Sequence, residues 1–325
     1  MTDKRPLAIR FHDFLASATD MNNPQYKKTW YVITAIARIL IGASAGDRIP
    51  TLQELVDFTG SSRGLVQNAL KHLQDEGGVC LLKKGKMGTF ISAIDVPALF
   101  RLGNLNFITG SMPTPLTLIL AGLATGICRM MNDCPVPFTF AFVQAAENRV
   151  DALLRRVYDF VVVSEKSAQV HVERHPELAA ATALSASLYA KPYVLCTRDP
   201  SVSEVKDGMK MAADPKSTDQ YMLTLNLCQG KNVEIVPCAF TTSHALFSSG
   251  AVDAVVFNND EWMRAPGIYA WPLPIADQRD SLRPCVLIHK DNLAIGDILR
   301  KYLRDSEIAQ MQADVVEGRA QAQYF

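Results

Sequence analysis

The chain has 325 residues, of which 48% are hydrophobic and 20% charged, and its 33 basic and 33 acidic residues give a formal net charge of zero. This composition excludes a disordered chain, and the length predicts two or three domains. The zero net charge excludes a general cationic field, so any affinity for nucleic acid must come from a local basic region.

The cysteines and apolar segments predict a cytoplasmic protein with no membrane partner. Seven cysteines are scattered without a C-x-x-C pair or zinc spacing, which is typical of free thiols in a reducing compartment. The N-terminus lacks the apolar core of a secretory signal. The apolar runs at 30–40 and 116–128 are interrupted or too short to span a bilayer, which needs roughly 20 residues, and they predict buried helices instead.

From residue 24 the pattern becomes helical, with apolar residues three or four apart up to Ile41. Thr51 and Glu54 have capping-box spacing, which begins a short helix that a turn at Thr59-Gly60 ends. A second helix is capped by Ser61 or Ser62 and ends at Gly77-Gly78. Two short helices joined by a glycine-containing turn predict a helix-turn-helix, whose recognition helix begins at Ser62-Arg63.

A β-hairpin is predicted directly after these helices, with strands at 79–82 and 89–92 around a basic, glycine-containing tip. A hairpin in this position makes the unit a winged helix. Between residues 24 and 92, nine basic residues outnumber five acidic ones, which gives a local charge of +4. This excess favours binding to DNA phosphates. The open alternatives are an ordinary solvated turn at the lysines and a winged helix that binds protein.

The runs I-P-T-L-Q-E-L, S-R-G-L-V-Q-N-A-L-K-H-L and K-G-K-M-G-T-F-I resemble the winged helix of GntR-type regulators. The resemblance implies that Arg63 contacts DNA and that Lys84 and Gly85 form a wing tip that enters the minor groove. Gln53 and Gln67 stand where that family often has arginine, although Gln67 and Asn68 can still read adenine. The predicted DNA-binding residues are Thr51, Gln53, Ser61, Ser62, Arg63, Gln67, Asn68, Lys71, Lys83, Lys84, Gly85 and Lys86.

Residues 93–103 are predicted to be a linker, because Pro97 and Gly103 interrupt the pattern. Residues 104–325 alternate apolar strands with amphipathic helices, as α/β domains do. The predicted strands are 105–109, 138–143, 160–164, 193–197, 209–213, 233–238, 254–258, 269–273 and 285–290. The predicted helices are 115–131, 146–157, 172–187, 217–229, 242–249, 292–304 and 305–318.

The segments S-G-A-V-D-A-V-V and D-P-K-S-T-D-Q resemble the type 2 periplasmic-binding fold, which also forms the effector domain of LysR-type regulators. The resemblance implies two α/β lobes joined by extended crossovers at 188–192 and 275–283. Lobe I would contain about 104–187 and 284–325, and lobe II about 193–274. The fold class is therefore an α+β winged helix in 1–92 followed by a two-lobed α/β, periplasmic-binding-like domain in 104–325. The whole arrangement resembles the YhfZ family of candidate bacterial transcription regulators.

Ligands of open α/β sheets lie beyond the C-terminal ends of the strands, against helix N-termini whose N–H groups favour an anion. Hydroxyl side chains recur at these places, and each is equally well explained as a helix cap, such as Ser217 with Gln220. The predicted ligand-binding residues are Gly110, Ser111, Thr114, Ser164, Glu165, Lys216, Ser217, Thr218, Thr242, Ser243, Asn258 and Asn259.

No phosphate-binding loop, nucleophile elbow or H-E-x-x-H motif occurs, so no catalytic residue and no cofactor are predicted. His171 and His175 have zinc spacing but no third ligand, and we expect a solvated helix end before Pro176 rather than a metal site. The leading hypothesis is a homodimeric transcription regulator, not an enzyme, that binds a double-stranded DNA operator and a small anionic effector. The alternatives are an enzyme on the same fold, as in prephenate dehydratases, and a protein-interaction module.

Overall fold

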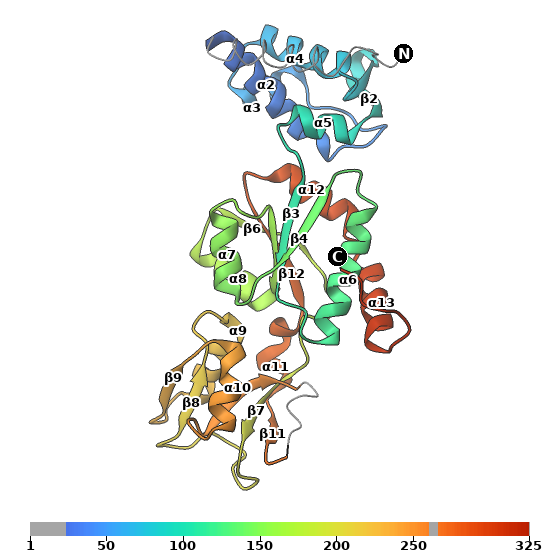
Figure 1. The fold of residues 1–325 in the computed structure, drawn as a ribbon. Helices are drawn as coiled ribbons and strands as arrows, with labels where there is room; N and C mark the ends of the chain where they lie inside the picture. The colour runs from blue at the N-terminus through green and yellow to red at the C-terminus, as the bar shows by residue number, and fades with distance from the viewer. Residues whose placement is uncertain (1–23, 260–265, 325) are drawn as a thin grey trace, which may run out of the picture. The chain divides into compact units, whose positions relative to one another are not determined.

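The structure is a computed structural model that describes residues 24–259 and 266–324 (Figure 1). The N-terminal segment 1–23, on which the prediction of no secretory signal rests, lies outside the described residues. The chain divides into two compact units between Asn106 and Phe107. No helix in the described ranges is both long and apolar enough to cross a membrane. The seven cysteines are free thiols.

The first unit is a helix-turn-helix followed by a hairpin. Its helices are α2 (Pro24–Ile41), α3 (Leu52–Thr59) and α4 (Arg63–Asp75), which contact one another around fully buried side chains such as Ile36 and Leu73. The strands β1 (Val79–Lys83) and β2 (Thr89–Ile94) pair antiparallel, and the 3₁₀ turn η2 (Gly85–Met87) joins them. Arg48 forms an additional antiparallel bridge to Phe90. The predicted winged helix is confirmed.

The ends of the two short helices follow the predicted capping. Thr51 accepts a hydrogen bond from the Glu54 N–H, and the Glu54 carboxylate accepts one from the Thr51 N–H at 2.6 Å. Gly60 ends α3 with a left-handed φ of 58°, which glycine adopts without strain. Ser62 caps α4 by accepting a bond from the Leu65 N–H. These caps set the turn and therefore the direction of α4.

The segment 93–103 is not a linker. It continues β2 and then forms the helix α5 (Val96–Leu102), whose first turn is capped by the Asp95 carboxylate. Leu99 is fully buried, and α5 packs against α2. Pro97, predicted to interrupt the pattern, fits the first turn of a helix because no hydrogen bond is required of its nitrogen there.

Each lobe of the second unit is built on one five-stranded sheet (Figure 1). Lobe I contains β3 (Ile108–Met112), β4 (Phe138–Phe142), β5 (Phe160–Ser164), β6 (Leu178–Ala183) and β12 (Pro284–His289), in the order β4-β3-β5-β12-β6. Lobe II contains β7 (Tyr193–Thr197), β8 (Lys210–Ala213), β9 (Glu234–Pro237), β10 (Ala254–Asn258) and β11 (Tyr269–Pro272), in the order β11-β7-β10-β8-β9. In both sheets three strands run parallel, and a strand that crosses from the other lobe joins them antiparallel. This is the predicted two-lobed α/β fold.

Helices cover both faces of each sheet. In lobe I, α7 (Ala146–Leu154) and α8 (Glu165–Arg174) lie on one side, and α6 (Leu118–Asn132) and α13 (Asp305–Val316) lie on the other (Figure 1). The remaining helix of this lobe, α12 (Leu293–Tyr302), contacts β6 and β12. In lobe II, α9 (Thr218–Cys228) and α10 (Phe240–Ser248) contribute to two different buried clusters of the sheet. The N-termini of α7, α8 and α9 follow strand ends, and this places them at the candidate site.

The helix predicted over 172–187 is wrong, because α8 ends at Arg174 and residues 178–183 form β6. The sequence L-A-A-A-T-A has helical propensity, but pairing with β12 overrides it. The first strand of the lobe, predicted at 105–109, covers Ile108–Met112 instead.

Two buried glutamines hold the crossovers between the lobes. The Gln312 side chain bonds both the N–H and the carbonyl of Leu188, at 2.8 and 2.7 Å. The Gln278 side chain bonds both backbone groups of Tyr193 in the same way. Residues 275–283, predicted to be extended, form the short helix α11 (Ile275–Gln278) and the 3₁₀ turn η4 (Arg279–Leu282).

Gly110, a predicted ligand-binding residue, has a packing role in β3. A Cβ atom at this position would lie 2.3 Å from the Phe160 ring on the neighbouring strand. We expect Gly110→Ala to lower the free energy of unfolding by about 3 kcal/mol, since overpacking a rigid core commonly costs 1–3 kcal/mol. Urea unfolding measures the loss. Gly64→Ala is the control, because its Cβ meets no atom within 4 Å, and equal stabilities of the two variants would refute the contact.

Candidate functional site

One face of α4 is buried and the opposite face carries polar side chains. Val66, Ala69 and Leu73 are buried against the unit. Arg63, Gln67 and Lys71 are exposed and spaced four residues apart, so they form one stripe along the helix, with exposed Asn68 beside it. A stripe of donors on the second helix of a helix-turn-helix has the geometry that the major groove of DNA requires.

Several predicted DNA-binding side chains around the turn have structural partners. Gln53 donates to the Asp57 carboxylate at 2.8 Å. Ser61 is buried and donates its hydroxyl to the Thr59 carbonyl, so Ser61 is positioned to stabilise the turn rather than to contact a ligand. Thr51 and Ser62 are exposed helix caps, which leaves them near solvent at the N-termini of α3 and α4.

The hairpin tip places three cations together. Lys83, Lys84 and Lys86 are exposed, and the Lys84 Nζ lies 4.6 Å from the centre of the Phe90 ring. Gly85 has a left-handed φ of 56°, and the Lys84 N–H donates to the Gly88 carbonyl at 2.8 Å to close the tip. The glycine therefore lets a short turn present lysines without backbone strain.

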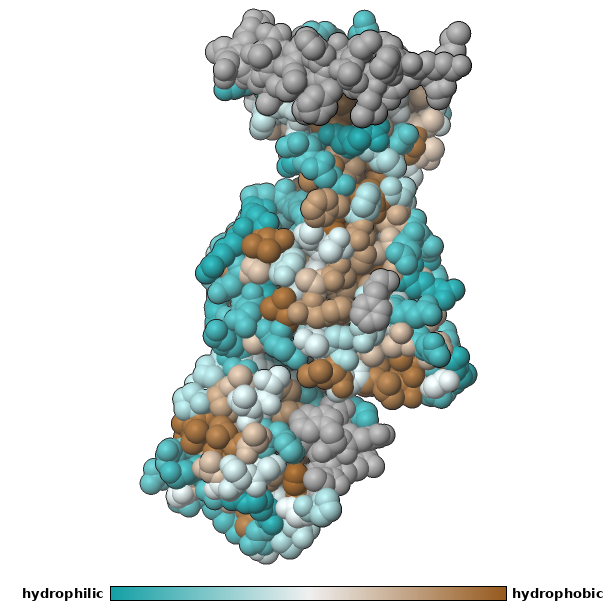
Figure 2. Space-filling model, viewed as in Figure 1, coloured by the Kyte–Doolittle hydropathy of each residue, from teal (hydrophilic) through white to brown (hydrophobic). Residues whose placement is uncertain are grey.

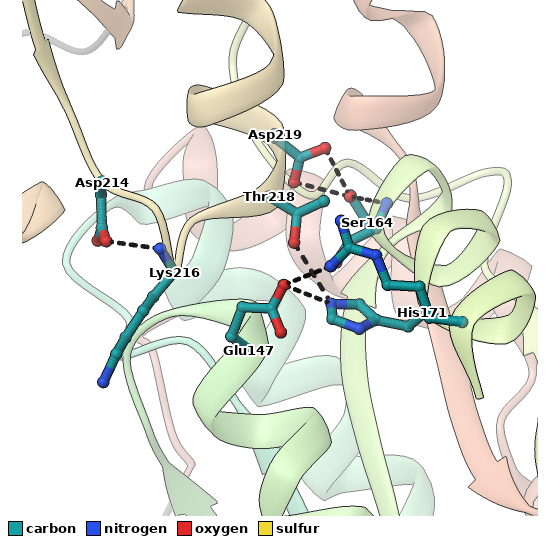
Figure 3. Close-up of polar contacts among 9 residues, drawn as sticks. Glu147, Ser164, His171, Asp214, Lys216, Thr218 and Asp219 are labelled. Carbon is teal, nitrogen blue, oxygen red and sulfur yellow. Dashed lines mark hydrogen bonds and ion pairs between the residues drawn. The ribbon is translucent and has the colours of Figure 1, made fainter. Parts of the chain in front are cut away.

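In the second unit, the lobes touch where β5 ends and α9 begins (Figure 3). Ser164 caps α8 by accepting a bond from the Ser167 N–H at 2.9 Å. The same hydroxyl lies 2.8 and 2.7 Å from the two carboxylate oxygens of Asp219 in lobe II. Ser164 is a predicted ligand-binding residue, and in this structure its partner is a carboxylate of the chain itself.

A second set of contacts lies beside the first. The Thr218 hydroxyl is 3.3 Å from His171 Nε2, and Glu147 Oε1 is 3.8 Å from the same nitrogen (Figure 3). The Glu147 N–H donates across the lobes to the Lys216 carbonyl at 3.2 Å, and Arg174 pairs with the Glu147 carboxylate at 3.0 Å. Predicted ligand-binding residues of both lobes therefore contact the opposite lobe. We call Glu147, Ser164, His171, Thr218 and Asp219 the interlobe cluster.

The interlobe cluster surrounds a buried charge. Burial raises the pKa of Asp219 to about 6, although hydroxyl groups of Ser281 and Ser164 and the charge of Arg149 favour its ionised form. Arg149 is itself fully buried and donates to the Val162 and Val143 carbonyls and to the Tyr189 hydroxyl.

Burial lowers the pKa of His171, and the Glu147 carboxylate opposes that shift. Among the described residues, three buried polar side-chain atoms have no hydrogen-bond partner: Ser111 Oγ, Ser167 Oγ and His171 Nδ1. Ala145, the residue before α7, has a φ of +66°, and strained backbone of this kind concentrates at functional sites.

The sequence interpretation missed Arg149 and Asp219. A signal for Arg149 was present, since it lies on the apolar stripe that Ala146, Val150 and Leu153 form on α7. A charge on a buried stripe needs partners, and here the partners are backbone carbonyls. Asp219 had no comparable signal, because polar residues are ordinary in the first turn of a helix.

The other predicted ligand-binding residues do not join the interlobe cluster. Thr242 and Ser243 donate to carbonyls of their own helix region, and Asn258 donates to the Lys191 carbonyl in the first crossover. The remaining six positions are the buried Ser111, the half-buried Thr114, Glu165 at 4.0 Å from Arg283, exposed Lys216, Ser217 without a side-chain capping bond, and exposed Asn259.

The predicted capping box of Ser217 with Gln220 is wrong. The Gln220 side chain instead accepts from the Asp214 N–H and donates to the Ala212 carbonyl. The helix end expected before Pro176 is confirmed, because α8 ends at Arg174 with Glu173 and Arg174 exposed, but His171 is fully buried rather than solvated. Within the part of the chain that the structure describes, no group of three metal-ligating residues exists.

A cavity of about 660 Å³ lies elsewhere in lobe I. It is bordered by Phe138 and Phe140 of the edge strand β4 and by Arg129 of α6. Figure 2 shows apolar side chains gathered over β4 with hydrophilic ones on both sides. This cavity is lined by none of the predicted ligand-binding residues and by none of the interlobe cluster.

We expect Asp219→Asn to stabilise the protein more at pH 8 than at pH 4. Because the pKa of Asp219 is about 6 in the folded protein and 3.8 ordinarily, folding has to bury a charge once the pH exceeds about 6. Protonated Asp219 contributes about 3 kcal/mol to the free energy of unfolding. This contribution is fully present below pH 4 and is lost as the pH rises from 4 to 6. Urea unfolding of both proteins at the two pH values measures it, and an equal difference at both values would contradict the assignment.

Comparisons with known proteins agree with both units. A helix-turn-helix domain profile matches residues 44–91, and the profile described as the YhfZ C-terminal domain matches residues 95–324. The "uncharacterized protein YhfZ" of Escherichia coli strain K12 is 31% identical over 302 residues, which cover 92% of this chain and 98% of that protein.

Solved structures show the same fold for the second unit. The crystal structure of YhfZ from Shigella flexneri has a TM-score of 0.58 and 27% identity, and the match covers 68% of this chain and 94% of that one. The periplasmic aliphatic sulphonate binding protein SsuA of Escherichia coli has a TM-score of 0.50 and 14% identity, with 66% and 75% covered. The latter likeness concerns the fold.

Proposed function

The chain belongs to the YhfZ family, and from this premise we propose that it is a transcription regulator that binds operator DNA and a small effector. One observation carries the proposal: a single chain joins an exposed recognition stripe and a lysine-tipped wing to a two-lobed domain of the binding-protein fold. Residues 24–106 would bind DNA, and residues 107–325 would bind the effector. We place the protein in the cytoplasm, where its operator would be.

The DNA half of the proposal rests on α4 and the wing. Arg63, at the first turn of α4, would contact DNA in the GntR-like manner, while Gln67 and Asn68 would read base edges. The lysines of the wing would contact phosphates or the minor groove. Helix-turn-helix proteins bind as two-fold dimers, and we propose a homodimer on two half-sites.

The effector half rests on the interlobe cluster. Helices α7, α8 and α9 all begin there, and helix N-termini favour anions. Lys216 supplies an exposed cation beside them. We therefore propose an anionic effector, which a thermal-shift screen of small anionic metabolites tests. A ligand at a hundredfold its Kd adds about 2.7 kcal/mol to the free energy of unfolding.

The residues of the interlobe cluster do not favour an enzyme. Thr218, His171 and Glu147 are the residue types of a hydrolytic triad, yet the hydroxyl and the carboxylate both approach Nε2. A triad needs the carboxylate on the other ring nitrogen, and His171 Nδ1 has no partner among the described residues. We propose a regulator without catalytic activity.

The salt dependence of DNA binding tests the proposal against a protein-interaction module. We expect the triple variant Lys83→Ala, Lys84→Ala, Lys86→Ala to weaken binding uniformly across sequences. It should lower the slope of log K against log salt by about 3, or about 1 for each lysine that neutralises a phosphate. Fluorescence anisotropy with a labelled duplex measures the slope. Failure of the wild-type chain to retain DNA at low ionic strength would favour the protein-interaction module.

A further inference from the structure

We infer that Asp219, a carboxylate of the chain itself, holds the two lobes together at the interlobe cluster, and that a carboxylate-bearing effector separates them by taking its place. The inference rests on the effector site that we propose at the interlobe cluster. It reverses the usual expectation for binding-protein folds, in which a ligand closes the lobes.

The Asp219 carboxylate occupies a buried position at the N-terminus of α8. Ser164 ends β5 and caps α8, a helix of 10 residues whose N-terminus favours negative charge. The Ser164 hydroxyl donates to the Asp219 carboxylate, and the Ser281 hydroxyl also bonds it. Ser164, Ser281 and Asp219 are all buried, which makes this a site built for a carboxylate rather than a surface contact.

The Asp219 carboxylate comes from lobe II, whereas α8 belongs to lobe I. Asp219 lies in the first turn of α9 in lobe II, whereas Ser164 belongs to lobe I (Figure 3). The Glu147 N–H bond to the Lys216 carbonyl and the approach of Thr218 to His171 reinforce the same junction. The position at the N-terminus of α8 where an effector anion would bind is therefore occupied by the Asp219 carboxylate.

The contact between Asp219 and Ser164 that joins the lobes is reversible. The pKa of Asp219 is raised because its charge has lost water, and Ser164, Ser281 and Arg149 compensate only in part. Opening the lobes would return the carboxylate to water and recover its hydration. Two buried polar atoms of α8, Ser167 Oγ and His171 Nδ1, also have no partner within residues 24–259 and 266–324. An effector carboxylate would therefore compete with the Asp219 carboxylate, whose burial is unfavourable because it has lost hydration.

Hydrogen exchange of the full chain, without DNA or effector, tests the closure. The Glu147 N–H is the reporter, because its acceptor lies on the other lobe. We expect Asp219→Ala to raise exchange in the peptide containing Glu147 on the order of tenfold, with peptides of α4 and β12 unchanged. Glu204→Ala removes an exposed carboxylate from the same lobe and should leave exchange as in the wild type.

Competition tests the ligand class. In the wild-type chain, sodium acetate should raise exchange at Glu147 in a saturable manner, and sodium chloride at the same ionic strength should not. Unchanged exchange at Glu147 in Asp219→Ala would overturn the closure, and equal effects of acetate and chloride would overturn the carboxylate site. If Asp219→Ala unfolds globally, Asp219→Ser, which removes the carboxylate but keeps a small polar side chain, should raise exchange at Glu147 in the same way. Because the exchange experiment uses neither DNA nor effector, a negative result would refute the role of Asp219 without refuting the proposed regulator. Failure to find an operator would refute the regulator without refuting the role of Asp219.

Discussion

Replacing Arg63 by alanine is expected to lower the affinity for operator DNA by about 10- to 100-fold, because a well-placed arginine contact contributes roughly 1–3 kcal/mol. Arg63 is exposed at the first turn of α4, and its neighbours on the buried face fix the helix that carries it. The N-terminal end of a recognition helix is the part that approaches the bases. The loss should apply to every sequence, since the arginine anchors the helix as a whole.

Fluorescence anisotropy at fixed salt measures this loss. Arg101→Ala is the matched control, because it removes the same charge from an exposed position of the same unit but from α5. Gln67→Ala and Asn68→Ala should instead relax base preference at one position each. If Arg63→Ala binds as tightly as Arg101→Ala, α4 is not the recognition helix.

Replacing Arg149 by methionine is expected to lower the free energy of unfolding by about 3–5 kcal/mol, as the loss of one partner from a buried charged network does. Its guanidinium bonds the Val162 carbonyl at 3.2 Å and the Val143 carbonyl and Tyr189 hydroxyl at 2.8 Å. Methionine fills much of the volume but leaves these groups without their donor, and it removes the positive charge near Asp219.

Calorimetry or urea unfolding measures the effect of Arg149→Met. Arg155→Met, at the residue that follows α7, is the control, because Arg155 is exposed and should change stability by less than about 0.5 kcal/mol. Arg149→Lys should also be destabilising, since one ammonium group cannot reproduce the planar set of donors. A stable, cooperative Arg149→Met protein would contradict the structural role of the guanidinium.

The parts of the fold that were predicted well have strong local signals. The predicted capping box of Thr51 and Glu54 and the predicted turn at Thr59-Gly60 are confirmed, and of the two predicted caps, Ser61 and Ser62, it is Ser62 that caps α4. The strands β5, β7 and β10 have the predicted bounds, because their apolar residues form short continuous runs that only a buried strand of that length explains.

The errors arise where a distant partner overrides the local pattern. The alanine-rich β6 pairs with a strand about a hundred residues later, and no periodicity within 178–183 reveals that partner. Pro97 resembles a breaker, yet its position in the first turn of α5 makes it compatible with a helix. The interlobe cluster depends on which helix of lobe II meets α8, and this is a property of the tertiary structure alone.

Selection of bound duplexes from a random pool by the purified full-length protein tests the central claim most directly. The account predicts enrichment of an inverted repeat whose half-sites lie about 34 Å apart, one turn of DNA, since a two-fold dimer would present two copies of α4 to one face. It also predicts that Arg63→Ala enriches the same repeat but needs about 10- to 100-fold more protein to do so. Recovery of no enriched sequence by the wild-type protein would contradict the claim that this chain reads an operator.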